Sequence, residues 1–294
     1  MPPTTHTPTL VAHMAVLSGA HRPKSIGAIR ECVERGVPRI EIDVHSLEGG
    51  DYVVTHDRKL EQQTTGRGSV GSVTADDIRA THFVDNPNDR PALLSEVAAL
   101  AAKSDIQIQL DLKDWRPLTR ARTKALLDAI APVRERVIVS SGQDWNLRLL
   151  AETEAIATGF DPGLYIDSAG DPYYLPQRLG AYNYRDDHPL ALTRTVAVAE
   201  YLEQRFEQLA LLAPASREWF VSYRLVLQVL DDGFDAPAWL RARGIAPNIW
   251  TLDYDGTPTT LAAYDRLAAA GVARVTTNTT LAWEEALSAR PASC

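Results

Sequence analysis

The sequence predicts an α/β protein, and within that class a single (β/α)8 TIM barrel that spans residues 1–294. Short apolar runs alternate with longer stretches rich in Ala, Leu and Arg, which is the pattern of parallel strands connected by helices. No internal repeat, low-complexity segment or break in composition marks a linker. With 294 residues, of which 45% are hydrophobic, the chain can bury the large core that one barrel requires.

Nine runs along the chain have the composition and length of strands. They are Leu10 to Met14, Arg39 to Val44, Tyr52 to Thr55, Ile106 to Leu112, Arg136 to Ser140, Ala155 to Gly159, Trp219 to Tyr223, Asn248 to Leu252, and Arg274 to Thr277. Because a TIM barrel has eight places, at least one run is expected to be an edge or accessory strand.

Helical periodicity is clearest in five stretches. They are Ser25 to Arg35, Leu94 to Lys103, Leu118 to Ile130, Leu190 to Leu212, and Thr259 to Ala270. Gly36 and Gly271 follow the first and the last of these stretches, where glycine commonly ends a helix.

Two long connections, at about 57–90 and 161–189, interrupt this alternation. Long irregular loops in compact domains are usually functional, and the loops after barrel strands form the active-site face. Both connections are therefore candidate walls of a substrate cleft. The second holds five tyrosines, and we expect one of them, Tyr184, to bind substrate; the alternative is a packed surface flap. The five are Tyr165, Tyr173, Tyr174, Tyr182 and Tyr184.

Acidic residues occur in two of the strand-like runs, where a strand buried on both faces should be continuously apolar. The runs are Ile40-Glu41-Ile42-Asp43-Val44 and Ile108-Gln109-Leu110-Asp111-Leu112-Lys113. Side chains at i and i+2 share one face of a strand, so Glu41 pairs with Asp43, and Asp111 pairs with Lys113. In neighbouring barrel strands, three carboxylates and one ammonium would converge on the axis. Since buried carboxylates need a partner and an all-oxygen cluster suits a hard ion, the sequence predicts a site for Mg²⁺ or Ca²⁺ at Glu41, Asp43 and Asp111.

Two histidines are candidate catalytic residues. His13 ends the first predicted strand, and His56 follows the third, immediately before Asp57. Both are therefore expected at carboxyl ends of strands, on the same rim as the acidic residues. A single histidine there is usually structural, but two imidazoles beside three carboxylates can serve as general base and general acid across a metal-bound phosphoryl group. His45 continues the inward face of Glu41 and Asp43.

The bulk properties limit the possible partners. The net charge of −8 and the isoelectric point near 5.4 argue against a nucleic-acid-binding protein. Cys32 and Cys294 are the only cysteines, which makes a disulfide framework or a thiolate metal site improbable on composition. The segment from Met1 to Thr9 has no signal-peptide pattern, and no run is long enough to cross a bilayer. We therefore expect a cytoplasmic protein without integral membrane association; the oligomeric state is left open.

Several motifs occur in a characteristic order along nearly the whole chain. Gly36 to Val44, followed by Gly50 to Asp57, is similar to a Gly-Ala-Asp-x-Ile-Glu-x-Asp-Val and Val-Val-x-His-Asp signature. The ordered set resembles the glycerophosphodiester phosphodiesterases, within the phosphatidylinositol-phospholipase-C-like barrels. The later matching motifs are Leu60 with Thr64-Thr65-Gly66, Ser140-Ser141, Trp250-Thr251-Leu252, and Gly271-Val272 to Thr277-Asn278.

This resemblance implies a (β/α)8 barrel whose Glu41, Asp43 and residue 111 hold a divalent ion. It also implies catalysis by His13 and His56 on a small-molecule phosphodiester, such as a glycerophosphodiester or a lysolipid. The family has a short connection between its second and third strands, as here between Val44 and Tyr52, which leaves no room for a crossover helix.

The chain departs from the family motifs at three places. His13-Met14-Ala15 stands where the family has His-Arg-Gly, so the phosphate-binding arginine is missing. Pro23-Lys24-Ser25-Ile26 stands for Pro-Glu-Asn-Thr, and Asp111-Leu112-Lys113 for Glu-x-Lys. The residues Met14, Asp111, Trp250 and Asn278 are closer to the sphingomyelinase D or phospholipase D branch, whose disulfide-bearing loop is absent from the sequence.

The expected chemistry follows from these residues. The ion polarises one non-bridging phosphate oxygen and Lys113 neutralises a second one, while the two histidines move protons. Water or a neighbouring substrate hydroxyl attacks; in the second case the first product is a cyclic phosphate. Trp250 lines the pocket or belongs to the core, and Tyr184 and Asn278 are further predicted substrate contacts.

Two other classes of function are compatible with the sequence. The missing arginine is compatible with a repurposed biosynthetic enzyme that acts on an unusual phosphodiester or diphosphate. A noncatalytic binding protein could instead keep the ion site for stability, because barrels host many unrelated functions.

Overall fold

The computed structural model describes residues 7–153, 156–167, 180–185 and 192–290. Eight parallel strands close into a barrel in the order β1-β9-β8-β7-β6-β5-β4-β2, and pairing of β1 with β2 completes the ring. The predicted TIM barrel is thus confirmed. The barrel strands are β1 (Thr9–His13), β2 (Arg39–Ser46), β4 (Gln107–Leu112), β5 (Val137–Ser141), β6 (Ala157–Phe160), β7 (Glu218–Ser222), β8 (Ala246–Trp250) and β9 (Arg274–Thr277).

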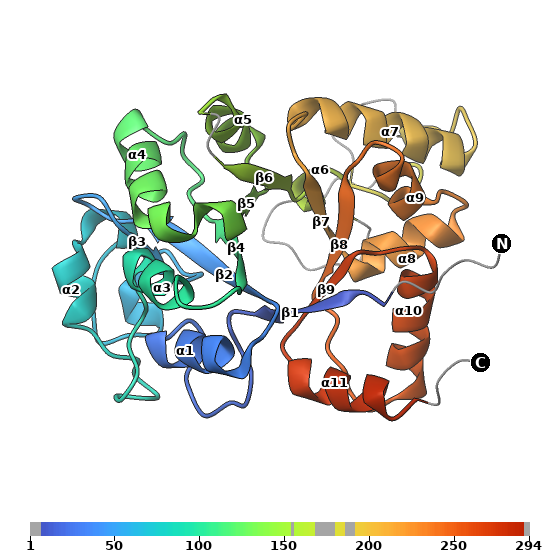
Figure 1. Ribbon diagram of the computed structural model, residues 1–294. Coiled ribbons are helices and arrows are strands. Elements are labelled where there is room, and N and C mark those ends of the chain that lie inside the picture. Colours follow the sequence, from blue (N-terminus) through green and yellow to red (C-terminus); the bar gives the residue numbers. More distant parts are fainter. Residues whose placement is uncertain (1–6, 154–155, 168–179, 186–191, 291–294) are drawn as a thin grey trace.

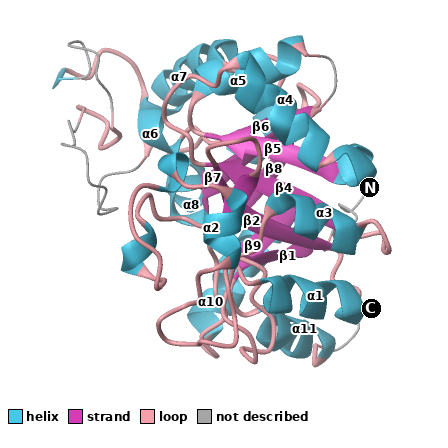
Figure 2. Cartoon of the chain, turned by 90° about the vertical axis from the view of Figure 1, so that its left-hand side faces the viewer, coloured by secondary structure: helices cyan, strands magenta, loops and turns pink. Residues whose placement is uncertain are grey.

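Helices surround the strands, with α1 to α4 from the first half of the chain on one side and α7 to α11 from the second half on the other (Figure 1). The view from the side places the strands at the centre, with helices outside them (Figure 2). The α-helices are α1 (Ile26–Arg35), α2 (Ala75–Arg79), α3 (Leu94–Ala101), α4 (Arg120–Ala129), α5 (Asp144–Glu152), α6 (Gly163–Ile166), α7 (Val198–Leu212), α8 (Tyr223–Asp231), α9 (Ala236–Arg241), α10 (Pro258–Ala269) and α11 (Thr280–Ser288).

The accessory strand is β3 (Tyr52–Val54), which pairs antiparallel with β2 and stands outside the ring. Val44 pairs with Val54 and Ser46 with Tyr52, so β2 and β3 form a hairpin. A hairpin needs only a short turn, whereas a parallel connection needs a crossover. This explains how nine strand-like runs fit a barrel of eight places.

Most predicted helix boundaries agree with the structure to within a few residues. Ser25 caps α1, and its Oγ accepts a hydrogen bond from the Ala28 amide at 3.0 Å. Gly36 ends the helix with φ 71°, a left-handed conformation that favours glycine. The prediction of a helix from Leu190 was wrong at its start, because α7 begins only at Val198.

The connection at 57–90 is a folded unit rather than a structureless loop. It contains two 3-10 turns, Leu60–Gln62 and Val70–Ser72, followed by α2, which a Thr74/Asp77 capping box starts. Its apolar residues pack against the β2–β3 hairpin and are buried there. This satellite core consists of Leu47, Val53, Leu60, Val70, Ile78 and Leu93.

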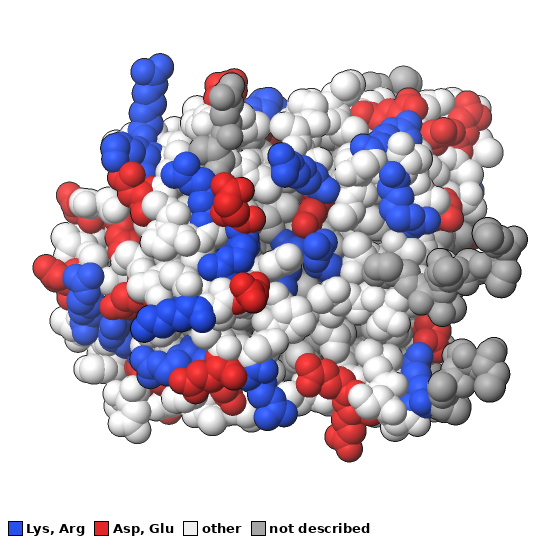
Figure 3. Space-filling view, viewed as in Figure 1, with Lys and Arg blue, Asp and Glu red and all other residues white. Residues whose placement is uncertain are grey.

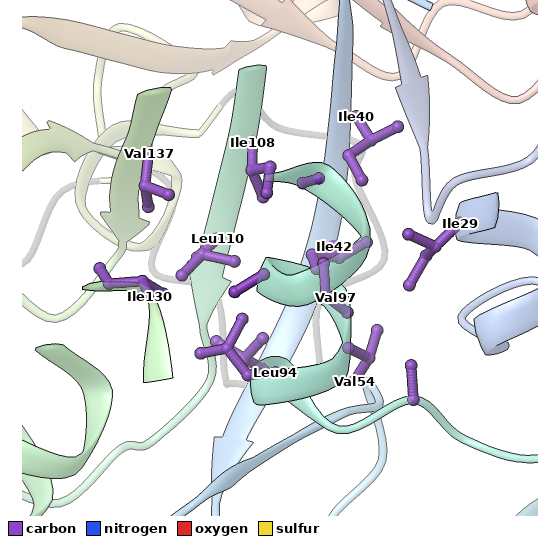
Figure 4. Close-up of a cluster of buried hydrophobic side chains, with 14 of the residues drawn as sticks. Ile29, Ile40, Ile42, Val54, Leu94, Val97, Ile108, Leu110, Ile130 and Val137 are labelled. Atoms are coloured by element: carbon purple, nitrogen blue, oxygen red, sulfur yellow. The ribbon is translucent and has the colours of Figure 1, made fainter. Parts of the chain in front are cut away.

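The main apolar cores lie outside the strands, between the barrel wall and the helices. Figure 4 shows the larger one, in which Ile40 and Ile42 of β2 and Leu110 of β4 pack against Leu94 and Val97 of α3. A second core surrounds Trp219 and Phe206 under the helices of the other half. The even-numbered residues of β2 and β4 therefore pack in this outer core and stabilise the fold. The odd-numbered residues of the same strands face the barrel interior.

Inside the barrel, four polar side chains near the amino ends of the strands form a basal ion-pair network. Arg39, only 2% exposed, places Nη1 3.0 Å from Glu218 Oε2, and Arg274 Nη1 lies 3.2 Å from Glu218 Oε1. Asn248 donates to Glu218 Oε2 at 2.8 Å. Burial lowers the pKa of Arg39 to about 10, although Glu218 counteracts this effect. Glu218 is thus the only carboxylate of the described residues that compensates both arginines.

The hydrophobicity of the helices and the charge of the surface are two further features of the fold. No helix in the described ranges is both long and apolar enough to cross a lipid bilayer. On the face of the molecule seen in Figure 3, the described Lys and Arg side chains are interspersed with Asp and Glu, and neither sign covers a large continuous area. This face therefore presents no basic stripe of the kind that follows a nucleic-acid backbone.

We predict that Glu218→Gln destabilises the protein by about 3–5 kcal/mol, because it leaves two neighbouring arginines in the barrel interior without a carboxylate. The free energy of unfolding in urea measures this loss. Asp265→Asn, which breaks an exposed pair with Arg290, is the matched control and should cost about 1 kcal/mol or less. Equal, small losses in both variants would contradict the proposed importance of the network.

Candidate active site

Three carboxylates meet inside the barrel, near the carboxyl ends of β2 and β4. The register pairs Glu41 with Gln109 and Asp43 with Asp111, so all these side chains point to the same side of the wall. Ligand atoms of Glu41, Asp43 and Asp111 lie within 4.8 Å of one another. Glu41 and Asp43 are 4% and 3% exposed. We call this group the acidic triad; the structure brings together the three residues that the sequence predicted as metal ligands.

Glu41 and Asp43 of the acidic triad have different electrostatic environments. Burial, together with repulsion from Asp43, raises the pKa of Glu41 to about 7. Burial also opposes ionisation of Asp43, but Lys113 and Lys24 outweigh it and hold the pKa of Asp43 below its usual range. Lys113 Nζ lies 2.6 Å from Asp111 Oδ2 and 3.2 Å from Asp43 Oδ1. Lys113 thus occupies the position that its i+2 spacing from Asp111 predicted.

The donor chemistry of the acidic triad fits a hard divalent cation. All three side chains offer carboxylate oxygens, which Mg²⁺ and Ca²⁺ prefer. Burial and repulsion from Asp43 disfavour the ionised form of Glu41, and a nearby cation would favour it. Within the described ranges, this is the only group of three or more carboxylate, imidazole or thiol side chains with ligand atoms so close together.

His13, the last residue of β1, lies next to the acidic triad. Its Nε2 is 3.6 Å from Glu41 Oε2, and its Nδ1 is 2.7 Å from Asn278 Oδ1. Asn278 donates from Nδ2 to Asp253 Oδ2 at 2.9 Å, so its oxygen faces the imidazole. A carbonyl oxygen accepts only from N–H, and His13 Nδ1 must therefore carry a proton. In the neutral imidazole, the lone pair is then on Nε2.

His56 lies at the same rim, but the strand that precedes it is not a strand of the barrel. It was predicted at the carboxyl end of a barrel strand, but β3 runs antiparallel to β2 and lies outside the ring. The hairpin extends past the rim and returns, which places the His56 carbonyl 3.2 Å from His45 Nε2. The imidazole is 58% exposed, with Nδ1 3.4 Å from Asp57 Oδ1. Its charge helps to lower the pKa of Asp43.

The other predicted substrate contacts have different environments. Trp250 ends β8 and pairs with Ser222, and its buried Nε1 has no hydrogen-bond partner among the described residues. Asn278 contacts His13 directly, which gives it a positioning role toward that histidine. The prediction that Tyr184 binds substrate was wrong. Its side chain is fully buried, and its hydroxyl donates to Asp232 Oδ2 at 2.6 Å.

Sequence reasoning missed three charged residues at this rim: Lys24, Asp161 and Asp253. Lys24 Nζ lies 4.0 Å from Asp43 Oδ2. Burial, assisted by repulsion from Asp111, raises the pKa of Asp161 to about 7. A signal was present for the two aspartates, because each follows a predicted strand at its carboxyl end. Of the tyrosines in the second long connection, Tyr173 and Tyr174 lie outside the described residues.

Comparison with known proteins identifies relatives. The model of the Glycerophosphoryl diester phosphodiesterase family matches residues 17–160. A glycerophosphodiester phosphodiesterase of Caldanaerobacter subterraneus is 29% identical over 185 residues, which are 58% of this chain and 75% of the relative. Glycerophosphodiester phosphodiesterase 1 of Mus musculus is 25% identical over 123 residues, 39% of this chain and 37% of that protein.

Solved structures share the fold along almost the whole chain. A phosphodiesterase of Oleispira antarctica, in complex with the product sn-glycerol-3-phosphate, superposes with a TM-score of 0.63 at 16% identity, covering 96% of this chain and 98% of that one. A glycerophosphoryl diester phosphodiesterase of Parabacteroides distasonis gives a TM-score of 0.64 at 18% identity, covering 99% and 90%. The chain is thus similar to the glycerophosphoryl diester phosphodiesterase family over residues 17–160, and it shares the barrel fold of these phosphodiesterases along almost its whole length.

Proposed function

We propose that the protein is a metal-dependent glycerophosphodiester phosphodiesterase that uses His13 and His56 for proton transfer. The observation that carries this proposal is the meeting of the acidic triad, His13 and Lys113 at one end of the barrel. The relatives named above support glycerophosphodiesters as the substrate class. Lysophospholipids, which present the same phosphodiester on a glycerol, are a second substrate class to be assayed.

Glu41, Asp43 and Asp111 would hold the divalent ion, whether Mg²⁺ or Ca²⁺. When bound, such an ion supplies Lewis-acid polarisation of a non-bridging phosphate oxygen. Lys113 stands beside two of these carboxylates and offers an ammonium to a second phosphate oxygen. A fixed positive charge in a partly buried site stabilises negative charge that develops on the phosphoryl group.

His13 has the geometry of a general base. Asn278 holds the proton on Nδ1, so Nε2 of the neutral ring is available to take a proton from the attacking hydroxyl. Asp253 fixes Asn278 through both its side chain and its backbone amide, at 2.9 and 2.6 Å. The chain Asp253–Asn278–His13 therefore sets the tautomer and orientation of the base.

His56 is the general acid in this proposal. Its ring is more exposed than that of His13, with Asp57 close to Nδ1. An imidazole in its protonated form can donate a proton to the departing alkoxide. The exposed position also suits a leaving alcohol, which must pass into solvent.

A second reaction outcome is favoured by particular residues. Met14 and Asp111 stand where the family motifs have Arg and Glu, as in the branch whose resemblance is noted above. In that outcome, a hydroxyl of the substrate attacks its own phosphate, which benefits from proximity, and a cyclic phosphate forms. The same two histidines would move the protons.

We expect single alanine substitutions of His13 and His56 to lower kcat for glycerophosphodiesters by roughly 10²–10⁴-fold, because each removes one proton transfer. A p-nitrophenyl phosphodiester separates their roles, since its leaving group needs no protonation. His56→Ala should retain most activity on that substrate, whereas His13→Ala should remain inactive. His82→Ala, an exposed histidine away from the acidic triad, is the control. Wild-type turnover in both variants would refute the proposal.

Metal binding should stabilise the protein more strongly at pH 8 than at pH 5.5. Burial raises the pKa of Glu41 to about 7, so ionising it costs folding free energy as pH rises from its ordinary value near 4.5 to 7. Without an ion, the stability from protonated Glu41 is present at acid pH and lost above 7; a bound ion restores it. Scanning calorimetry with Mg²⁺, Ca²⁺ or EDTA measures the shift in Tm. In Glu41→Gln the pH dependence of this shift should become weaker, and an unchanged dependence would contradict the assignment.

The reaction products distinguish hydrolysis from cyclisation. We expect hydrolysis of glycerophosphodiesters, with ¹⁸O from labelled water incorporated into the phosphate monoester in a single step. A cyclic phosphate that accumulates in ³¹P NMR spectra before any labelled monoester would instead establish the second outcome. An uncleavable diester analogue incubated in parallel controls for spontaneous exchange.

A further inference from the structure

Lys24 is a buried lysine beside the acidic triad that the mechanism above does not use. The residue is 6% exposed, and its ammonium lies 4.0 Å from Asp43 Oδ2, on the carboxylate oxygen not facing Lys113. In the described part of the chain, Asp43 is the only carboxylate within 4.0 Å of this ammonium. Lys113 is closer to its own partners, at 2.6 and 3.2 Å. Lys24 is therefore the more loosely paired of the two cations.

The backbone holds Lys24 in an unusual conformation. Its φ of 70° lies in the left-handed region, which a lysine adopts only when the surroundings impose it. The Lys24 amide donates to the Met14 carbonyl at 3.0 Å, and its carbonyl accepts from the Ala92 amide at 3.2 Å. The next residue, Ser25, caps α1. These contacts fix where the side chain starts and direct a charged group toward the acidic triad.

The hydrogen bond between Lys24 and Met14 joins two positions at which this chain departs from the family motifs. Position 14 lacks the positive charge of the motif, and position 24 has gained one. Both residues belong to the turn between β1 and α1, and the Met14 amide donates to Glu41 Oε2 at 3.2 Å. Relative to these motifs, position 14 lacks a cation and Lys24 supplies one, and both residues of the β1–α1 connection contact the acidic triad.

Lys24 adds a positive charge to the group that the acidic triad, Lys113 and a divalent ion would form. The acidic triad carries three negative charges once Glu41 is ionised. Lys24, Lys113 and a divalent ion carry four positive charges between them. Among these groups, Lys24 adds the positive charge that exceeds the three negative charges, and this favours an anionic ligand such as a phosphodiester.

We propose that Lys24 is a phosphate-binding residue that donates to a non-bridging oxygen of the substrate phosphodiester. This inference rests on the proposed function for the identity of the substrate, but its binding component can be measured independently. An ammonium is a compact point charge with three donors, so Lys24 can turn from Asp43 to a phosphate oxygen without leaving its pocket.

Lys24→Met removes the charge and keeps most of the aliphatic stem. We expect it to raise KM for glycerophosphocholine and the Kd for inorganic phosphate, measured by titration calorimetry with and without Ca²⁺, by roughly tenfold to a hundredfold. Lys103→Met, which removes an exposed lysine after α3, should change neither constant. Introducing Met14→Arg into Lys24→Met should restore phosphate affinity, because it returns a cation to the same turn.

The outcomes separate this inference from the proposed function. If wild-type protein cleaves the substrate and Lys24→Met leaves both KM and phosphate Kd unchanged, the role of Lys24 is overturned and the function stands. If Lys24→Met alters only Tm or ion affinity, Lys24 is a counter-ion of Asp43, and the proposal is again overturned. If no phosphodiester is cleaved but phosphate affinity depends on Lys24, the binding role stands and the proposed function fails.

Discussion

The pairing of β2 with β4 is the constraint on which the rest of the structure depends. It places Asp43 beside Asp111 and Glu41 two residues below, with all three side chains inside the barrel. The opposite faces of the same strands carry Ile40, Ile42 and Leu110 into the outer core. Because the side-chain period of a strand is two, a slip of one residue would turn the apolar side chains into the barrel interior. The same slip would place the charged side chains in the outer apolar core. The apolar packing of α3 against this wall therefore also determines the geometry of the acidic triad.

The barrel interior is stratified by charge. Near the amino ends of the strands, Glu218 compensates Arg39 and Arg274, and the basal ion-pair network is closed on itself. Near the carboxyl ends, the three carboxylates of the acidic triad lie beside Lys113 and Lys24, and burial together with repulsion from Asp43 raises the pKa of Glu41 to about 7. Buried charges that are paired with one another serve stability, whereas incompletely paired ones are typical of functional sites. The basal ion-pair network and the proposed ion site thus lie at opposite ends of the barrel strands.

Residues at which the chain departs from the family motifs lie close to one another in the structure. Met14 and Lys24 are far enough apart in sequence to look like unrelated changes, yet their backbones share a hydrogen bond in one turn. Asn278 appears in the sequence as part of a closing motif, and in the structure it links Asp253 to His13. Each of these residues contacts a neighbour that sequence order does not reveal.

The sequence alone was sufficient for the barrel, for the acidic triad and for Lys113. Strand periodicity and the i, i+2 spacing are local properties, and local properties can be read from adjacent residues. It failed for Tyr184, because only packing shows that a phenol is buried against Asp232. Its argument for His56 was also incorrect, since the direction of β3 depends on its pairing with β2. The tautomer of His13 and the position of Lys24 were decided by the tertiary structure, because both result from hydrogen bonds and ion pairs between elements that are distant in the chain or joined by an irregular turn.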